Sequence, residues 1–195
     1  DRILVLDSQG PNGLALCRTL GKRGLSVTAG GSTRYMPGML SKYTDDSYVH
    51  PPIEEDHTRF VDHLVSHLES NNYRMVIPVT DTTTSILSRH KQRVEATGTA
   101  VGAEDWETFL RANDKARLFD LVDDVAIPTP ETHAPESISD VAAIDRGRSD
   151  RVVVKPRRTT VTMGNGESSK VRIAGANYVD PDEDLVERYR ELLDT

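Results

Sequence analysis

Two lysines in the second half of this sequence occupy positions that suit the binding of phosphate. Lys155 directly follows a β-branched apolar run at residues 152–154, which predicts a short strand. A lysine at the end of a strand can place its ammonium group over a bound phosphate. Lys115 follows Asn113 and Asp114 at the start of a helical pattern. Both lysines are therefore candidates for binding a nucleotide phosphate.

A polar loop that contains Gly164 and Gly166 follows Lys155, and a second apolar run follows the loop at residues 171–173. The two runs and the loop predict an antiparallel hairpin with a long tip. Backbone N–H groups of such a tip can close over a phosphate that the lysine binds. An ordinary edge hairpin with a solvated lysine would show the same pattern, so these residues alone leave both interpretations open.

The first 105 residues alternate between predicted strands and predicted helices. The continuous apolar run at residues 3–6 is typical of a strand buried in a parallel sheet, further strands are expected at residues 25–29, 75–79 and 99–101, and helical spacing separates several of them. This alternation predicts a doubly wound α/β domain. Ligands of such sheets bind beyond the carboxyl ends of the strands. The substrate-binding candidates there are Gly10 and Gly13 after the first strand, Arg34 in the polar loop 32–47, and Asp81 after the strand at 75–79.

Two of these candidates have competing interpretations. Asp81 is first of all a suitable N-cap for the helix that follows it, and it can serve in both roles. Gly10 and Gly13 have some likeness to a dinucleotide-binding turn, but their spacing is G-x-x-G and not G-x-G-x-x-G. Gly30 and Gly31 follow the second strand, where an acidic residue would bind a ribose. NAD(P) binding is therefore the third hypothesis for this chain.

The second half predicts a mixture of helices and short strands. Helices are expected at residues 114–122, 137–144 and 180–193, the last with Asp180 as its N-cap, and a strand is expected at 131–134. His63 and His67 in the first half are spaced as a helical metal pair would be. No third ligand is placed near them, so both are expected on an exposed flank, and we predict no metal ligand and no catalytic residue in this chain.

Asp114-Lys115, the segment from Val152 to Pro156 and the Gly164/Gly166 loop stand in an order that resembles the ATP-grasp superfamily. The resemblance implies a pre-ATP-grasp domain at residues 1–105 and the first α+β half of an ATP-grasp domain at 106–195. It also implies that Lys115, Lys155, Gly164 and Gly166 bind ATP, with Mg²⁺ ligands outside this chain. The activity implied is a carboxylate–amine ligase, or a ligase like carbamoyl-phosphate synthase, that acts through an acyl-phosphate. A non-catalytic nucleotide-binding module is the alternative.

The composition restricts the partners of the protein. Lys and Arg number 24 against 31 Asp and Glu, so the net charge of −7 offers no basic surface for nucleic acid. Cys17 is the single cysteine, which excludes a disulfide framework and indicates a small buried apolar residue. No apolar run has the length of a membrane span. We expect a cytoplasmic protein whose partners are a small carboxylate and an amine, with a second copy as a possible further partner.

The resemblance also predicts that this chain is a fragment that does not hydrolyse ATP by itself. The superfamily holds ATP between two α+β halves, and residues 106–195 correspond only to the first. We therefore expect no phosphate release when the chain is incubated with ATP, magnesium and mixed amino acids. Turnover that persists after contaminating ATPases are removed would contradict this placement of the fold.

Overall fold

The computed structural model describes residues 1–53, 56–124, 127–145, 151–155, 157, 160–162, 168–170 and 177–193. The chain forms two compact units. The first comprises Asp1–Leu110 with Thr160–Ser169, and the second comprises Arg111–Thr159 with Lys170–Thr195.

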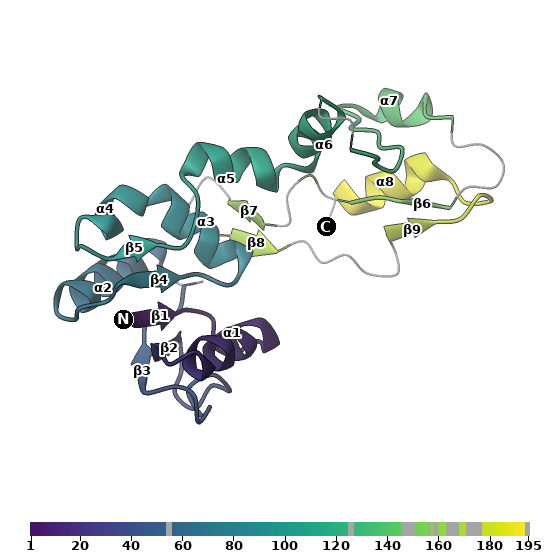
Figure 1. The fold of residues 1–195 in the computed structure, drawn as a ribbon. Helices are drawn as coiled ribbons and strands as arrows, with labels where there is room; N and C mark the ends of the chain where they lie inside the picture. The colour runs from purple at the N-terminus through teal and green to yellow at the C-terminus, as the bar shows by residue number, and fades with distance from the viewer. Residues whose placement is uncertain are drawn as a thin grey trace. The chain divides into compact units, whose positions relative to one another are not determined.

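The first unit is built on a five-stranded sheet in the order β3-β2-β1-β4-β5, and each pair of neighbouring strands is parallel (Figure 1). Its strands are β1 (Arg2–Val5), β2 (Ser26–Gly31), β3 (Asp46–Val49), β4 (Met75–Ile77) and β5 (Ala100–Val101). The sequence predicted a doubly wound α/β fold, and this sheet with its flanking helices confirms the prediction.

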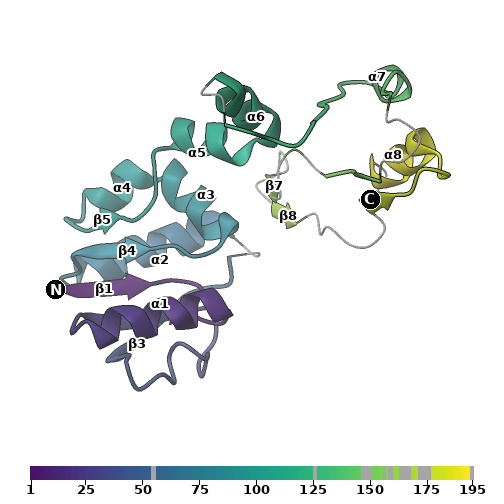
Figure 2. The same ribbon diagram turned by 45° about the vertical axis from the view of Figure 1, so that its right-hand side comes forward.

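Helices cover both faces of this sheet because successive residues of each strand point to opposite sides. Leu4 and Leu6 pack against helix α2 (His57–Glu69) and the helices α3 (Asp81–Arg89) and α4 (Lys91–Glu95). Ile3 and Val5 pack on the other face against α1 (Pro11–Lys22), where Cys17 is fully buried as predicted. Figures 1 and 2 show the helices on either side of the strands.

The helix starts of the first unit are fixed by short polar side chains. Asp56 accepts a hydrogen bond from the Arg59 N–H at 3.0 Å and caps α2. Thr80 caps α3 by accepting from the Thr83 N–H. The sequence analysis assigned this cap to Asp81, which was wrong by one residue: Asp81 is exposed and is the first residue of the helix.

A network of aromatic and histidine side chains joins α2 to the sheet. The Tyr48 ring stacks on the His67 ring with centroids 4.1 Å apart, and the Tyr48 hydroxyl lies 2.8 Å from Nδ1 of His63. Nε2 of His67 lies 3.0 Å from the Tyr73 hydroxyl. His63 is exposed as expected, but His67 is half-buried, so the prediction of an exposed flank was wrong for His67.

The second unit contains helices and one short two-stranded sheet. Helix α5 (Trp106–Asn113) leads from the first unit into the second. The second unit then has α6 (Lys115–Asp124), α7 (Ile138–Ala142), β6 (Val152–Val153), β9 (Tyr178–Val179) and α8 (Leu185–Leu193). Ser137 and Asp140 form the capping box that the sequence indicated for α7.

Two further strands, β7 (Thr160–Thr162) and β8 (Ser168–Lys170), form a separate two-stranded sheet.

Two predictions for the second half were wrong, and a third is not tested by the described residues. Residues 131–134 form no strand. Strand β6 pairs antiparallel with β9, whereas its predicted partner at residues 171–173 lies outside the described residues. Helix α8 begins after Asp184, whose carboxylate accepts from the N–H of Val186 at 2.8 Å, and not after Asp180. Asp180 instead accepts the Glu183 N–H in a turn that precedes the helix.

We predict that Gly13→Ser destabilises the first unit, whereas Gly10→Ser does not. A Cβ atom at residue 13 would lie 2.4 Å from the backbone oxygen of Asp7, and backbone cannot move aside at little cost. Such overpacking costs about 1–3 kcal/mol. A Cβ atom at Gly10 meets nothing within 4 Å, and Ser is a favourable N-cap for α1. Urea unfolding of both variants checks this, and equal loss of stability in the two would contradict it.

We predict that stability falls as the pH drops below about 6.5, in part through His67. Burial and the neighbouring Arg2 lower the pKa of His67 below its ordinary value of 6.5, with a smaller contribution from His63 that the carboxylate of Asp46 opposes. As the pH falls, the His67 imidazole therefore binds a proton at a higher pH in the unfolded chain than in the folded one. The stability that neutral His67 contributes is complete above about pH 6.5 and is lost as the pH falls through its folded-state pKa.

Urea unfolding at about pH 7.5 and about pH 5.5 measures this pH dependence. The difference between the two free energies of unfolding should be smaller in His67→Gln than in the wild type. The same substitution at His133, in the second unit, controls for the loss of a histidine. An unchanged difference in His67→Gln would show that His67 does not carry the effect.

Candidate functional site

The carboxyl ends of β1 and β4 are joined by a buried aspartate. Asp7 follows β1 and is 5% exposed. Its Oδ2 accepts hydrogen bonds from the N–H groups of Val79 and Thr80, both at 3.0 Å, and from the Thr83 hydroxyl. The strand order reverses between β1 and β4, which is where sheets of this kind bind ligands. The Asp7 carboxylate therefore has a structural role at the point where a ligand would otherwise be expected.

The sequence analysis missed Asp7. Its φ of 56° is a left-handed backbone conformation, which asparagine and aspartate adopt more readily than most other residues. An aspartate directly after an apolar strand and before a glycine-containing turn was the available signal. The partners of its carboxylate lie more than seventy residues away along the chain, at Val79, Thr80 and Thr83.

Gly10 and Gly13 lie in the turn between β1 and α1 and have different roles. Gly10 is the N-cap of α1, with open space where its side chain would be, and no side chain caps the helix. Gly13 is buried against the backbone of Asp7 and Ser8, so its missing side chain is a packing requirement. Gly10 is partly exposed and Gly13 is buried, and the substrate contact predicted for both stays a prediction.

Arg34 and Asp81 are both exposed at this edge of the sheet. Arg34 belongs to the long loop between β2 and β3, and this loop is tied to the β1–α1 turn by a hydrogen bond from the Gly38 N–H to the Ser8 carbonyl at 2.9 Å. The next residue, Tyr35, is 77% exposed with a φ of 65°. No contact among the described residues tests the predicted binding role of Arg34 or Asp81, so both roles stay predictions.

The second unit places Asp114 at the start of α6 in contact with Arg157. The Asp114 side chain is 2% exposed and accepts two hydrogen bonds from the guanidinium, Nε to Oδ1 and Nη2 to Oδ2, both at 3.1 Å. Oδ1 also accepts from the N–H groups of Ala116 at 3.1 Å and Arg117 at 3.4 Å, so Asp114 caps the helix. The guanidinium of Arg157 therefore binds this carboxylate.

Backbone hydrogen bonds bring the chain around both predicted lysines into one region. The Lys115 N–H donates to the Arg157 carbonyl at 3.0 Å. Lys155 is exposed and lies two residues before Arg157. The residue before it, Val154, exchanges two hydrogen bonds with Asn177, at 2.8 and 3.1 Å. The backbone at the start of α6, where Lys115 lies, is therefore bonded to Arg157, two residues after Lys155.

Gly164 and Gly166 lie outside the described residues, so the predicted phosphate-closing loop stays a prediction. Among the described residues, no group of three His, Cys, Asp or Glu side chains could hold a metal ion. Across that same part of the chain, no helix combines the length and the apolar character needed to cross a membrane.

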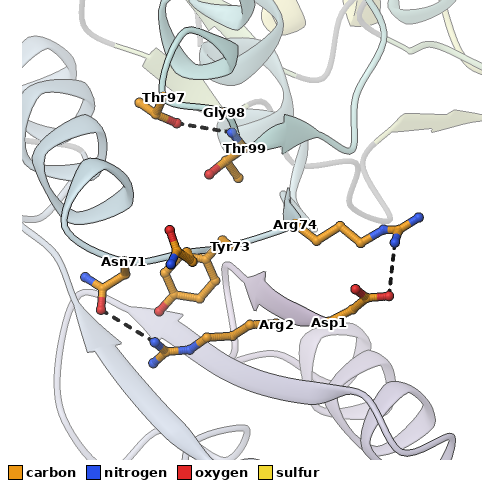
Figure 3. A pocket seen from close by; sticks show the side chains of 9 residues that line it. Asp1, Arg2, Asn71, Tyr73, Arg74, Thr97, Gly98 and Thr99 are labelled. Atoms are coloured by element: carbon orange, nitrogen blue, oxygen red, sulfur yellow. Dashed lines mark hydrogen bonds and ion pairs between the residues drawn. The ribbon is translucent and has the colours of Figure 1, made fainter.

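A cavity of about 300 Å³ lies at the opposite, amino-terminal edge of the sheet (Figure 3). Its two arginines already have acidic partners: Arg2 is paired with Asp46, and Arg74 is paired with Asp1 at 3.0 Å. The cavity contains none of the predicted site residues and lies away from the strand ends that bind ligands in α/β sheets. Its lining is made of Asp1, Arg2, Asn71, Asn72, Tyr73, Arg74, Thr97, Gly98 and Thr99.

Sequence comparison gives no family: no protein-family model matches, and no curated protein matches. The structure is similar to that of the L-amino acid ligase from Bacillus licheniformis, with a TM-score of 0.64 and 17% identity over 99% of this chain and 42% of that one. It is also similar to N5-carboxyaminoimidazole ribonucleotide synthetase from Thermotoga maritima, with a TM-score of 0.55 and 18% identity over 88% of this chain and 41% of that one.

A third similar structure is the biotin carboxylase domain of a single-chain bacterial carboxylase, with a TM-score of 0.51 and 16% identity over 73% of this chain and 33% of that one. These neighbours are ATP-grasp ligases, so the fold is one that ATP-grasp ligases contain. The resemblance stated from the sequence is thus confirmed at the level of the fold. The chain spans 42% of the length of the Bacillus ligase.

Proposed function

We propose that this chain supplies the phosphate-binding lysines of an ATP-dependent ligase that joins a small carboxylate to an amine through an acyl-phosphate. The observation that carries the proposal is the backbone hydrogen bond from Lys115, at the start of α6, to Arg157, which lies two residues after Lys155. Two fixed cations in one region can meet the negative charge of a transferred phosphoryl group. The likeness of the fold to ligases of carboxylates and amines supports the same function.

The described residues around Lys115 and Lys155 are better suited to binding a nucleotide phosphate than to binding Mg²⁺. Lys115 is half-buried at the first position of α6, and Lys155 is exposed, so both side chains have access to solvent. The carboxylate nearest to them along the chain is Asp114, whose oxygens already bind Arg157 and the helix N–H groups. It is therefore unsuited to Mg²⁺, which prefers carboxylate oxygens in octahedral geometry. The proposal derives no step through a metal.

A non-catalytic nucleotide-binding module is the second candidate, because it would use the same lysines without turnover. An NAD(P)-binding domain is the third, and the packing of Gly13 against Asp7 counts against reading Gly10 and Gly13 as a dinucleotide fingerprint. A cytoplasmic location and small-molecule partners belong to the same proposal. ATP and NADH titrations distinguish the third candidate from the first two.

We predict that Lys155→Ala and Lys115→Ala each weaken ATP binding without unfolding the protein. Loss of a charge-assisted hydrogen bond to phosphate removes about 1.5–3 kcal/mol, which is about a tenfold to hundredfold loss of affinity. The double variant should lose less than the product of the two single losses, because both lysines would contact one phosphate group. Titration with a fluorescent ATP analogue at moderate salt measures all three affinities.

Lys22→Ala is the matched control, since Lys22 is an exposed lysine at the end of α1 in the other unit. Its removal changes the net charge equally and should leave the affinity for ATP unchanged. If a lysine of the proposed pair behaves like Lys22, that lysine has no role in phosphate binding.

A further inference from the structure

Asp114 is a buried carboxylate whose two oxygens are bonded on two sides. On the side of its own helix, Oδ1 accepts the N–H groups of Ala116 and Arg117. On the other side, both oxygens accept the planar guanidinium of Arg157 at 3.1 Å. A carboxylate at this position occupies the positive end of the α6 dipole. The start of α6 therefore already holds an anion, and this anion is part of the protein.

Arg157 joins two segments that are distant in the sequence through both its side chain and its backbone. The guanidinium fixes Asp114, and the carbonyl oxygen accepts the Lys115 N–H at 3.0 Å. The paired, planar geometry of an arginine–carboxylate bond restricts rotation as well as distance. The first turn of α6 therefore cannot shift relative to Arg157 without breaking several hydrogen bonds.

Lys155 lies between two such attachments. On one side, Val154 is held by Asn177, which is 2% exposed. On the other side, Arg157 is only two peptide steps away, and each step spans about 3.8 Å. The backbone of Lys155 is thus restrained relative to Lys115 even though its own side chain is exposed.

The geometry points to Asp114 and Arg157 as positioning residues that hold Lys115 and Lys155 side by side, so that both ammonium groups reach the same phosphate. This inference rests on the proposed function and extends it. In this arrangement the guanidinium of Arg157 binds the Asp114 carboxylate, and Lys115 and Lys155 alone bind the phosphate.

Asp114→Asn tests this assignment through the sign of its effect on ATP affinity. If Arg157 were itself a phosphate ligand, removal of the Asp114 charge would release the guanidinium and tighten ATP binding. A positioning role predicts the opposite, because the weakened pair lets the two lysines separate. We expect Asp114→Asn and Arg157→Lys each to weaken ATP binding about fivefold or more, since lysine keeps the charge of Arg157 but not its paired geometry.

A double-mutant cycle measures the coupling between Lys115 and Lys155 in ATP binding. This coupling would not change if Arg157 only stabilised the fold. Lys115→Ala, Lys155→Ala and the double variant are titrated with ATP in the wild-type background and again with Arg157→Lys. In the wild-type background, each single variant loses ATP affinity by some factor. The product of these two factors should exceed the factor lost by the double variant about threefold or more. With Arg157→Lys, the two losses should become multiplicative, because the lysines no longer act on one group.

Each outcome decides the question. Tighter binding with Asp114→Asn, or non-additivity that survives Arg157→Lys, would overturn the positioning role. If neither lysine affects ATP affinity, the proposed function is wrong and the positioning role is wrong with it. Circular dichroism of every variant checks folding. Should the buried Asp114→Asn variant not fold, Arg157→Lys carries the test, because the Arg157 side chain is 53% exposed.

Discussion

The structure of the first unit depends on one buried charge, the carboxylate of Asp7. β1 and β4 are neighbouring parallel strands at the point where the strand order reverses, and the turns that follow their carboxyl ends need a link of their own. Asp7 provides that link with two backbone N–H groups and one hydroxyl on its Oδ2. A buried carboxylate needs such partners, because an unpaired charge in the interior is strongly unfavourable. The backbone at Asp7 is left-handed, and Gly13 packs against the backbone oxygen of the same residue.

The second unit uses the same physical device at a different place. Asp114 is also a buried carboxylate at the start of a helix, and its partners are the helix N–H groups and an arginine. In both units the protein's own carboxylate satisfies donors that could otherwise bind a ligand anion. A phosphate bound near α6 must then be met by side-chain cations. The proposed function therefore assigns phosphate binding to Lys115 and Lys155 and not to the helix end.

The likeness to ATP-grasp ligases concerns the fold, and the function follows from particular residues. At 17% identity, the Bacillus ligase shares an arrangement of strands and helices with this chain. A fold of this kind supports several activities, whereas an activity depends on groups placed in a site. The proposed activity depends on two residues, Lys115 and Lys155. The hydrogen bonds that hold them in place are not specified by similarity of fold. The packing of Gly13 illustrates the difference: its spacing from Gly10 suggests a ligand turn, but its neighbours explain it as a packing requirement.

The sequence by itself determined the elements that depend on local pattern. The apolar runs gave the buried strands β1, β2 and β4, and helical spacing gave α1 and α2, because burial on a strand or helix face follows a fixed period. Local capping gave α7 through Ser137 and Asp140. The order of the motifs also indicated the ATP-grasp fold.

Only the tertiary structure decided which distant residues meet. In the structure β6 pairs with β9, and residues 131–134 form no strand. Arg157 binds the Asp114 carboxylate, and the Asp7 carboxylate binds the turn after β4. Strand partners and buried ion pairs depend on residues far apart along the chain, so no local pattern specifies them. Hydrogen bonds across those distances form only when the whole unit has packed, and the roles proposed for Lys115 and Lys155 depend on them.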